Sequence, residues 1–86
     1  MTDTAANAIG LAGSALFIAA FAYANMARQL DKLWFNAANL AGALLLLVSL
    51  SVHFNLAAFV LELAWAAIAL FGLTQAILAR IGKARQ

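Results

Sequence analysis

The sequence contains no cysteine and no proline, and it carries little charge, with five basic and three acidic residues among 86. Without cysteine, a disulfide framework, a thiolate metal site and a thiol nucleophile are excluded. Without proline, the usual source of helix kinks is missing, so straight and uninterrupted helices are expected. The few basic residues form two short clusters instead of the broad basic surface that nucleic acid requires, so we expect no nucleic-acid partner.

The chain is strongly apolar. Hydrophobic residues make up 67% of the sequence, whereas about 45–50% is typical of soluble domains. A domain of about 60 residues buries only about 60% of its unfolded surface, so a chain of this size cannot hide so many apolar side chains from water. We therefore expect the apolar excess to face membrane lipids.

Three long apolar runs are separated by short polar segments. RQLDK follows the first run, and His53 and Asn55 follow the second. A helix of about 20 apolar residues crosses a bilayer core of about 30 Å. We predict an all-α polytopic membrane protein, a single transmembrane domain over residues 1–86 with three transmembrane helices in a small bundle. The predicted elements are helices at 5–27, 33–52 and 57–79 and a basic cytoplasmic tail at 80–86.

The basic residues lie on one side of these spans. Arg28 and Lys32 fall between the first two runs, and the other three basic residues follow the third run. Lys and Arg in short loops stay in the cytoplasm, so the N-terminus is expected outside and the C-terminus inside. The first run is not expected to be a signal peptide, because a signal peptide begins with basic residues and this N-terminus carries Asp3 instead.

Small and polar residues indicate which helix faces contact one another, because helices in lipid associate through close packing and hydrogen bonds. On the first helix, Gly10 and Ser14 form a small-xxx-small pair. On the second helix, small and polar side chains gather in one narrow sector at 100° per residue. The third helix places Glu62 on an alanine-lined face. The residues predicted to make helix-packing or partner contacts are Gly10, Gly13, Ser14, Asn36, Asn39, Gly42, Ser49, His53, Glu62 and Trp65.

Glu62 is the only charged residue inside the third run. An unpaired charge costs about 2.5–3.5 kcal/mol near the centre of a membrane and less toward its surface. Glu62 lies about 8 Å below the outer end of its helix, so we expect its carboxyl group to bond Ser49, His53 or a neighbouring subunit. Two interpretations are open: a proton- or cation-handling site with His53, or a hydrogen bond that sets helix register or an oligomer contact. We favour the second.

The sequence contains no catalytic constellation. Its two aspartates, Asp3 and Asp31, lie outside the apolar runs, and there is no Ser-His-Asp set, phosphate-binding glycine loop or carboxylate pair. His53 has no second histidine or cysteine with which to form a metal site. We expect no enzyme activity, no metal and no cofactor.

Each apolar run contains one characteristic stretch: IGLAGSALFIAAFAY in the first, FNAANLAGALLLLVSL in the second and LAAFVLELAWAAIAL in the third. Together these stretches resemble a group of short bacterial three-helix inner-membrane proteins with a permease-like domain of unknown function. The motifs are the glycine-rich start, Tyr23, Asn39 with Gly42, and Trp65, and they cover residues 9–73. The resemblance implies a multi-pass protein of the bacterial inner membrane. A more remote similarity is to SemiSWEET and PQ-loop transporters, whose three-helix units dimerise around a solute path. Their proline-glutamine motif is replaced here by YANMARQ.

Three helices are too few to enclose a solute path alone, so a homo-oligomer or a larger membrane-protein complex is expected. The favoured function is a non-catalytic accessory or interaction subunit of a membrane assembly. The alternative is a SemiSWEET-like homodimeric transporter of a small solute, in which Asn36 and Asn39 would line the path.

Overall fold

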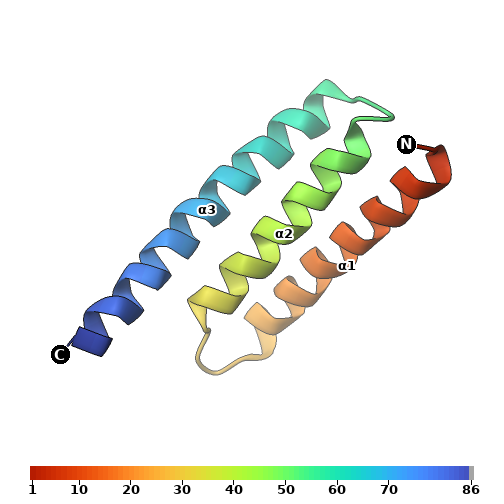
Figure 1. The fold of residues 1–86 in the computed structure, drawn as a ribbon. Helices are drawn as coiled ribbons and strands as arrows, with labels where there is room; N and C mark the ends of the chain where they lie inside the picture. Colours follow the sequence, from red (N-terminus) through yellow and green to blue (C-terminus); the bar gives the residue numbers. More distant parts are fainter. Residues whose placement is uncertain (86) are drawn as a thin grey trace.

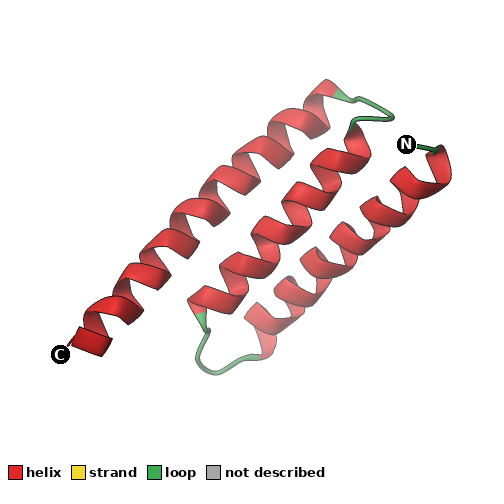
Figure 2. Cartoon of the chain, in the orientation of Figure 1, coloured by secondary structure: helices red, strands yellow, loops and turns green. Residues whose placement is uncertain are grey.

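The computed structural model describes residues 1–85, which form three α-helices joined by two short turns (Figures 1 and 2). The helices are α1 (Asp3–Met26), α2 (Lys32–Leu50) and α3 (Leu56–Arg85). They run down, up and down in the view of Figure 1, so α1 and α3 are parallel to each other and antiparallel to α2. All three are long and apolar enough to cross a membrane. The predicted all-α class with three such helices is therefore confirmed for the described residues.

Each helix begins next to a polar side chain that caps it. Thr2, Asp31 and Asn55 each accept a hydrogen bond, 3.0–3.1 Å long, from a backbone N–H in the first turn of the helix that follows. Short polar side chains at this position satisfy amide groups that have no partner inside the helix. The caps explain why the helices start within two residues of the predicted positions.

The end of the third helix differs from the prediction. We expected the helix to stop at residue 79 and to be followed by a basic tail at 80–86, but α3 continues through Arg85. Nothing in ARIGKAR stops a helix: proline is absent, and Ala, Arg and Lys are good helix formers. Gln86 lies outside the described residues.

The second helix also ends earlier than predicted, at Leu50 instead of residue 52. The hydroxyl group of Ser51 donates a hydrogen bond to the carbonyl oxygen of Val48 at 2.6 Å. The backbone N–H of Ser51 bonds the same oxygen at 3.1 Å. Serine side chains compete with the helix in this way and favour turns, so the chain leaves the helix before the polar segment containing His53.

Helix α2 lies between α1 and α3 and packs against both (Figure 1). Within residues 1–85, no Cα atom of α1 comes within 8 Å of a Cα atom of α3. The fold is therefore an open arrangement around a central helix, and contact between the two outer helices depends on long side chains.

The interior is made of small residues, and no large side chain is fully buried among the described residues. The backbones of α1 and α2 approach closely at one crossing, where a Cβ atom added to Gly13 would lie 2.8 Å from the carbonyl oxygen of Gly42. Helices in membranes approach closely through such residues. The buried residues are Ala6, Gly13, Ala20, Asn39, Gly42, Ala43 and Ala69.

Candidate functional site

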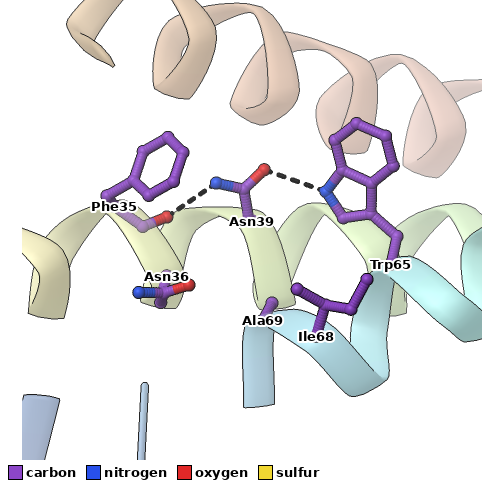
Figure 3. Close-up of a pocket in the computed structure, with 6 residues that line it drawn as sticks. All are labelled: Phe35, Asn36, Asn39, Trp65, Ile68 and Ala69. Atoms are coloured by element: carbon purple, nitrogen blue, oxygen red, sulfur yellow. Dashed lines mark hydrogen bonds between the residues drawn. The ribbon is translucent and has the colours of Figure 1, made fainter. Parts of the chain in front are cut away.

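Asn39 is the only polar side chain buried in the described part of the chain, with 7% of its surface exposed. Its Oδ1 atom accepts a hydrogen bond from Nε1 of Trp65 at 3.0 Å. Its Nδ2 atom donates to the carbonyl oxygen of Phe35, one helical turn earlier, at 2.9 Å (Figure 3). Both ends of the amide are thus paired inside the protein, and one of these bonds joins α2 to α3.

Trp65 also connects α3 to α1. Its ring stacks on that of Phe17, with ring centroids 5.1 Å apart. Phe17 can cross α2 at this level because Gly42 has no side chain; a Cβ atom there would lie 2.7 Å from the Phe17 ring. Gly42 therefore allows an aromatic bridge between two helices whose backbones do not meet.

Two clefts adjoin this bridge and share Phe35, Asn39 and Trp65. The first has a volume of about 260 Å³ and is otherwise lined by Asn36, Ile68 and Ala69 of α2 and α3 (Figure 3). The second, about 330 Å³, is bounded on the α1 side by Phe17, Ile18, Phe21 and Ala24.

Asn36 contributes to the contact between α2 and α3. Its Nδ2 atom donates to the carbonyl oxygen of Lys32 at 2.8 Å. On its other side, a Cβ atom added to Gly72 would lie 2.5 Å from Oδ1 of Asn36. Gly72 is thus the position at which α3 makes room for the amide, and it was not among the predicted contact residues.

Ser49 joins α2 to α1 near the end of the bundle that holds the α2–α3 turn. Its hydroxyl group donates to the carbonyl oxygen of Ala6 at 2.7 Å. Gly10 lies against the same side chain, since a Cβ atom there would be 2.7 Å from Ser49 Oγ. Ser14, one turn further along α1, is partly buried.

Glu62 is partly buried, and its Oε2 atom is inaccessible and has no hydrogen-bond partner among residues 1–85. The two partners expected within the chain are engaged elsewhere. Ser49 bonds Ala6, and Nε2 of His53 lies 3.1 Å from Oδ1 of Asp3, with both side chains largely exposed. The expectation that Ser49 or His53 bonds Glu62 was wrong, because α1 supplies closer partners for both.

Asp31, like Gly72, was not among the predicted contact residues. Its Oδ2 atom lies 2.7 Å from Nη2 of Arg80 in α3, and its backbone N–H donates to the hydroxyl group of Tyr23 in α1 at 2.7 Å. Because its Oδ1 atom also caps α2 through Leu33, Asp31 joins all three helices. An aspartate before a helix indicates a cap, but no local signal indicates a partner 49 positions away.

No group of three or more His, Cys, Asp or Glu side chains among the described residues is placed to hold a metal ion. The polar side chains inside the helices mostly bond the protein's own backbone or a neighbouring helix. The arrangement defines an all-α protein of three helices, each long and apolar enough to cross a membrane, whose buried residues are small apart from Asn39.

The chain belongs to a protein family, because the family model matches residues 6–80. The function of that family is uncharacterised, which is consistent with the resemblance to an uncharacterised bacterial group. No curated protein and no solved structure matches the chain. The similarity to SemiSWEET and PQ-loop transporters receives no support from the family match.

Proposed function

We propose that this protein is a multi-pass protein of the bacterial inner membrane that acts as a non-catalytic accessory or interaction subunit of a larger membrane assembly. Placement in a membrane is supported by three helices of sufficient length and apolar composition. It is also supported by large apolar side chains that are mostly exposed, including Ile18, Phe21, Ile68 and Phe71. Lipid or the apolar surface of another membrane protein would cover them.

The proposed orientation places the N-terminus outside and the C-terminus in the cytoplasm. Arg28 lies in the turn between α1 and α2, and Lys32 is the first residue of α2. This turn is at the same end of the molecule as the last turns of α3 (Figure 1), which contain Arg80 and Lys83. Retention of Lys and Arg in the cytoplasm would put this end inside.

The observation that carries the subunit role is where the large side chains lie. The interior is built from alanine, glycine and one asparagine, and no large side chain is fully buried among residues 1–85. The outer helices α1 and α3 each pack on one side only. The bulky side chains of the chain thus lie on its surface, where they are suited to packing against further helices.

Glu62 gives this role a specific contact point. The Glu62 side chain is partly buried on α3, and its Oε2 atom is inaccessible and has no partner within residues 1–85. Burying an unpaired acid in a membrane is expensive, so a hydrogen-bond donor from a neighbouring subunit would stabilise it. We assign Glu62 to a contact with that subunit.

A homodimeric transporter of a small solute is the second candidate. The observation that favours it is the cleft of about 260 Å³ beside two amide side chains, Asn36 and Asn39. In a dimer, two such clefts could meet around a path. The pairing of both ends of Asn39 within the chain leaves that residue few bonds to offer a solute, so we rank this function second.

The size and composition of the particle obtained after mild detergent extraction from the native membrane test both candidates. Co-migration with a larger complex is the result expected for a subunit. A discrete homodimer would favour transport and call for flux assays on Asn39→Ala and Glu62→Gln. A protein that is monomeric under all mild conditions would contradict both.

A further inference from the structure

The cleft of about 330 Å³ between α1 and α3 forms a groove over the face of α2. Phe35 and Asn39 of α2 form its floor, and the stacked rings of Phe17 and Trp65 join its α1 side to its α3 side. From Phe17 to Ala24 the α1 wall extends about 10 Å at 1.5 Å per residue. The groove therefore lies inside the apolar part of the helices, where the surrounding medium in the proposed location is hydrocarbon.

The side chains that line this groove have no free hydrogen-bonding group for a polar ligand. Asn39 is its only polar side chain, and both ends of its amide are paired, with Trp65 and with the Phe35 carbonyl. A hydroxyl or amide group placed in the groove would lose its bonds to water without replacement, which is unfavourable. The occupant must therefore be apolar over the length of the groove.

The aromatic bridge also limits what can occupy the groove. The rings of Phe17 and Trp65 are stacked, with centroids 5.1 Å apart, so they fill the space between α1 and α3 at this level, and a helix with its side chains, about 10–12 Å across, would need that space. A helix from a second copy or another protein cannot enter between α1 and α3 while this stack is formed. A hydrocarbon chain is thin and flexible enough to lie alongside the rings.

We propose that this groove binds one acyl chain of a membrane lipid. The exposed side chains of Ile18 and Phe21 form one rim, and Trp65, which is 43% exposed, forms the opposite rim. The hydrogen bond from Trp65 to Asn39 holds the indole as a fixed wall. The inference rests on the proposed membrane location.

The test is mass spectrometry of the intact protein under native conditions, after detergent extraction and removal of loosely bound lipid. The wild type is expected to retain one lipid per chain. Ala24→Phe, which places a ring in the groove, is expected to lose it. Ala22→Phe is the matched control, because Ala22 is exposed on the same helix and does not line the groove, and it is expected to keep the lipid.

A second measurement covers the case in which Ala24→Phe does not fold. With Trp34→Phe, Trp65 is the only tryptophan left. The protein is loaded with phospholipid carrying brominated acyl chains and then diluted into unbrominated lipid. Quenching of Trp65 fluorescence that persists after dilution supports a bound chain. Immediate and complete recovery of Trp65 fluorescence overturns the proposal, since such recovery indicates that the lipid beside Trp65 exchanges freely with bulk lipid.

Three further results would overturn the proposal. The two variants could retain lipid equally, the wild type could retain no lipid, or the wild type could retain a polar solute or a second copy of the chain in place of a lipid. The proposed location fails in a different way. If alkaline washing releases the protein from the membrane fraction, membrane insertion itself is wrong, whereas a protein that stays in the membrane but retains no lipid refutes the groove alone.

Discussion

Asp31 and Arg80 form an ion pair of 2.7 Å between carboxylate and guanidinium, and this pair joins the end of α3 to the turn before α2. The same aspartate caps α2, and its backbone N–H donates a hydrogen bond to the hydroxyl group of Tyr23 in α1. One residue at the basic end of the molecule thus connects all three helices, although the backbones of α1 and α3 do not come within 8 Å of each other between Cα atoms.

Loss of Asp31 is expected to cost more stability than loss of Arg80. Arg80 and Asp31 are 54% and 33% exposed, and an exposed ion pair contributes about 0–1 kcal/mol. Asp31→Ala also removes a helix cap, which typically costs about 1 kcal/mol. Unfolding in mixed micelles should therefore show a larger effect for Asp31→Ala than for Arg80→Ala. Equal effects would mean that the ion pair, not the cap, accounts for the role of Asp31.

Trp65 and Asn39 are expected to be energetically coupled. Trp65→Phe removes the N–H donor and keeps an aromatic ring to stack on Phe17. Hydrogen bonds between helices in a membrane contribute about 0.6 kcal/mol on average and up to about 1.7 kcal/mol. A double-mutant cycle of Trp65→Phe with Asn39→Ala, measured by unfolding in mixed micelles, should give a coupling in this range. Additive effects would show that the bond contributes nothing to stability.

Substitution of glycine should depend strongly on its position. At Gly42, the methyl group of alanine would meet the ring of Phe17 at 2.7 Å, whereas nothing lies within 4 Å of the same group at Gly82. Overpacking typically costs about 1–3 kcal/mol, so Gly42→Ala should destabilise the protein. Gly82→Ala should be neutral or stabilise α3 by up to about 1 kcal/mol.

Shortening the side chain that meets Gly42 provides a control for this comparison. The combination of Gly42→Ala with Phe17→Leu relieves the close contact, so it should cost less than the sum of the two single changes. A Gly42→Ala protein as stable as the wild type would contradict the closeness of α1 and α2.

Glu62→Gln should affect assembly of the native particle without lowering the stability of the isolated chain. Because Oε2 of Glu62 has no partner within residues 1–85, the amide should leave the stability of the isolated chain unchanged or increase it. Ser49→Ala, by contrast, removes a bond to Ala6 and should cost about 0.5–1.5 kcal/mol. Under the proposed subunit role, Glu62→Gln should reduce the size or yield of the native particle. An unaltered particle would argue against a contact at Glu62.

The orientation can be tested with single cysteines, since the natural sequence has none. Asn55→Cys lies in the α2–α3 turn and Gln29→Cys in the α1–α2 turn. A maleimide that cannot cross the membrane should label Asn55→Cys in intact cells and Gln29→Cys only after permeabilisation. The opposite pattern would invert the orientation that the basic residues predict.

Much of the fold could be predicted because its signals are local. The lengths of the apolar runs and the polar segments between them depend only on neighbouring residues, as do caps such as Thr2 and Asn55. The end of α3 was predicted less well, since the basic residues that follow the span were taken to end the helix. Charge marks where a chain leaves the hydrocarbon, but it does not terminate a helix.

The candidate site was predictable as a set of residues but not as a set of contacts. Sequence spacing brought Asn39, Gly42 and Ser49 onto one face of the second helix, and all three contact neighbouring helices in the structure. Neither partner expected for Glu62 within the chain, Ser49 or His53, bonds it, because residues at similar depth need not face one another. A bond to a neighbouring subunit stays a prediction. Gly72 and Asp31 were missed, since each matters only through a residue on another helix.

The sequence by itself determined that the chain forms three apolar helices, because length, apolar content and capping are properties of short segments. Only the tertiary structure decided that α2 is central, that Trp65 bonds Asn39 from 26 positions away and that Arg80 reaches Asp31 from 49 positions away. These contacts depend on the register and rotation of one helix against the next. Both are set by which side chains fit together at each crossing, a relation between distant segments that no single segment contains.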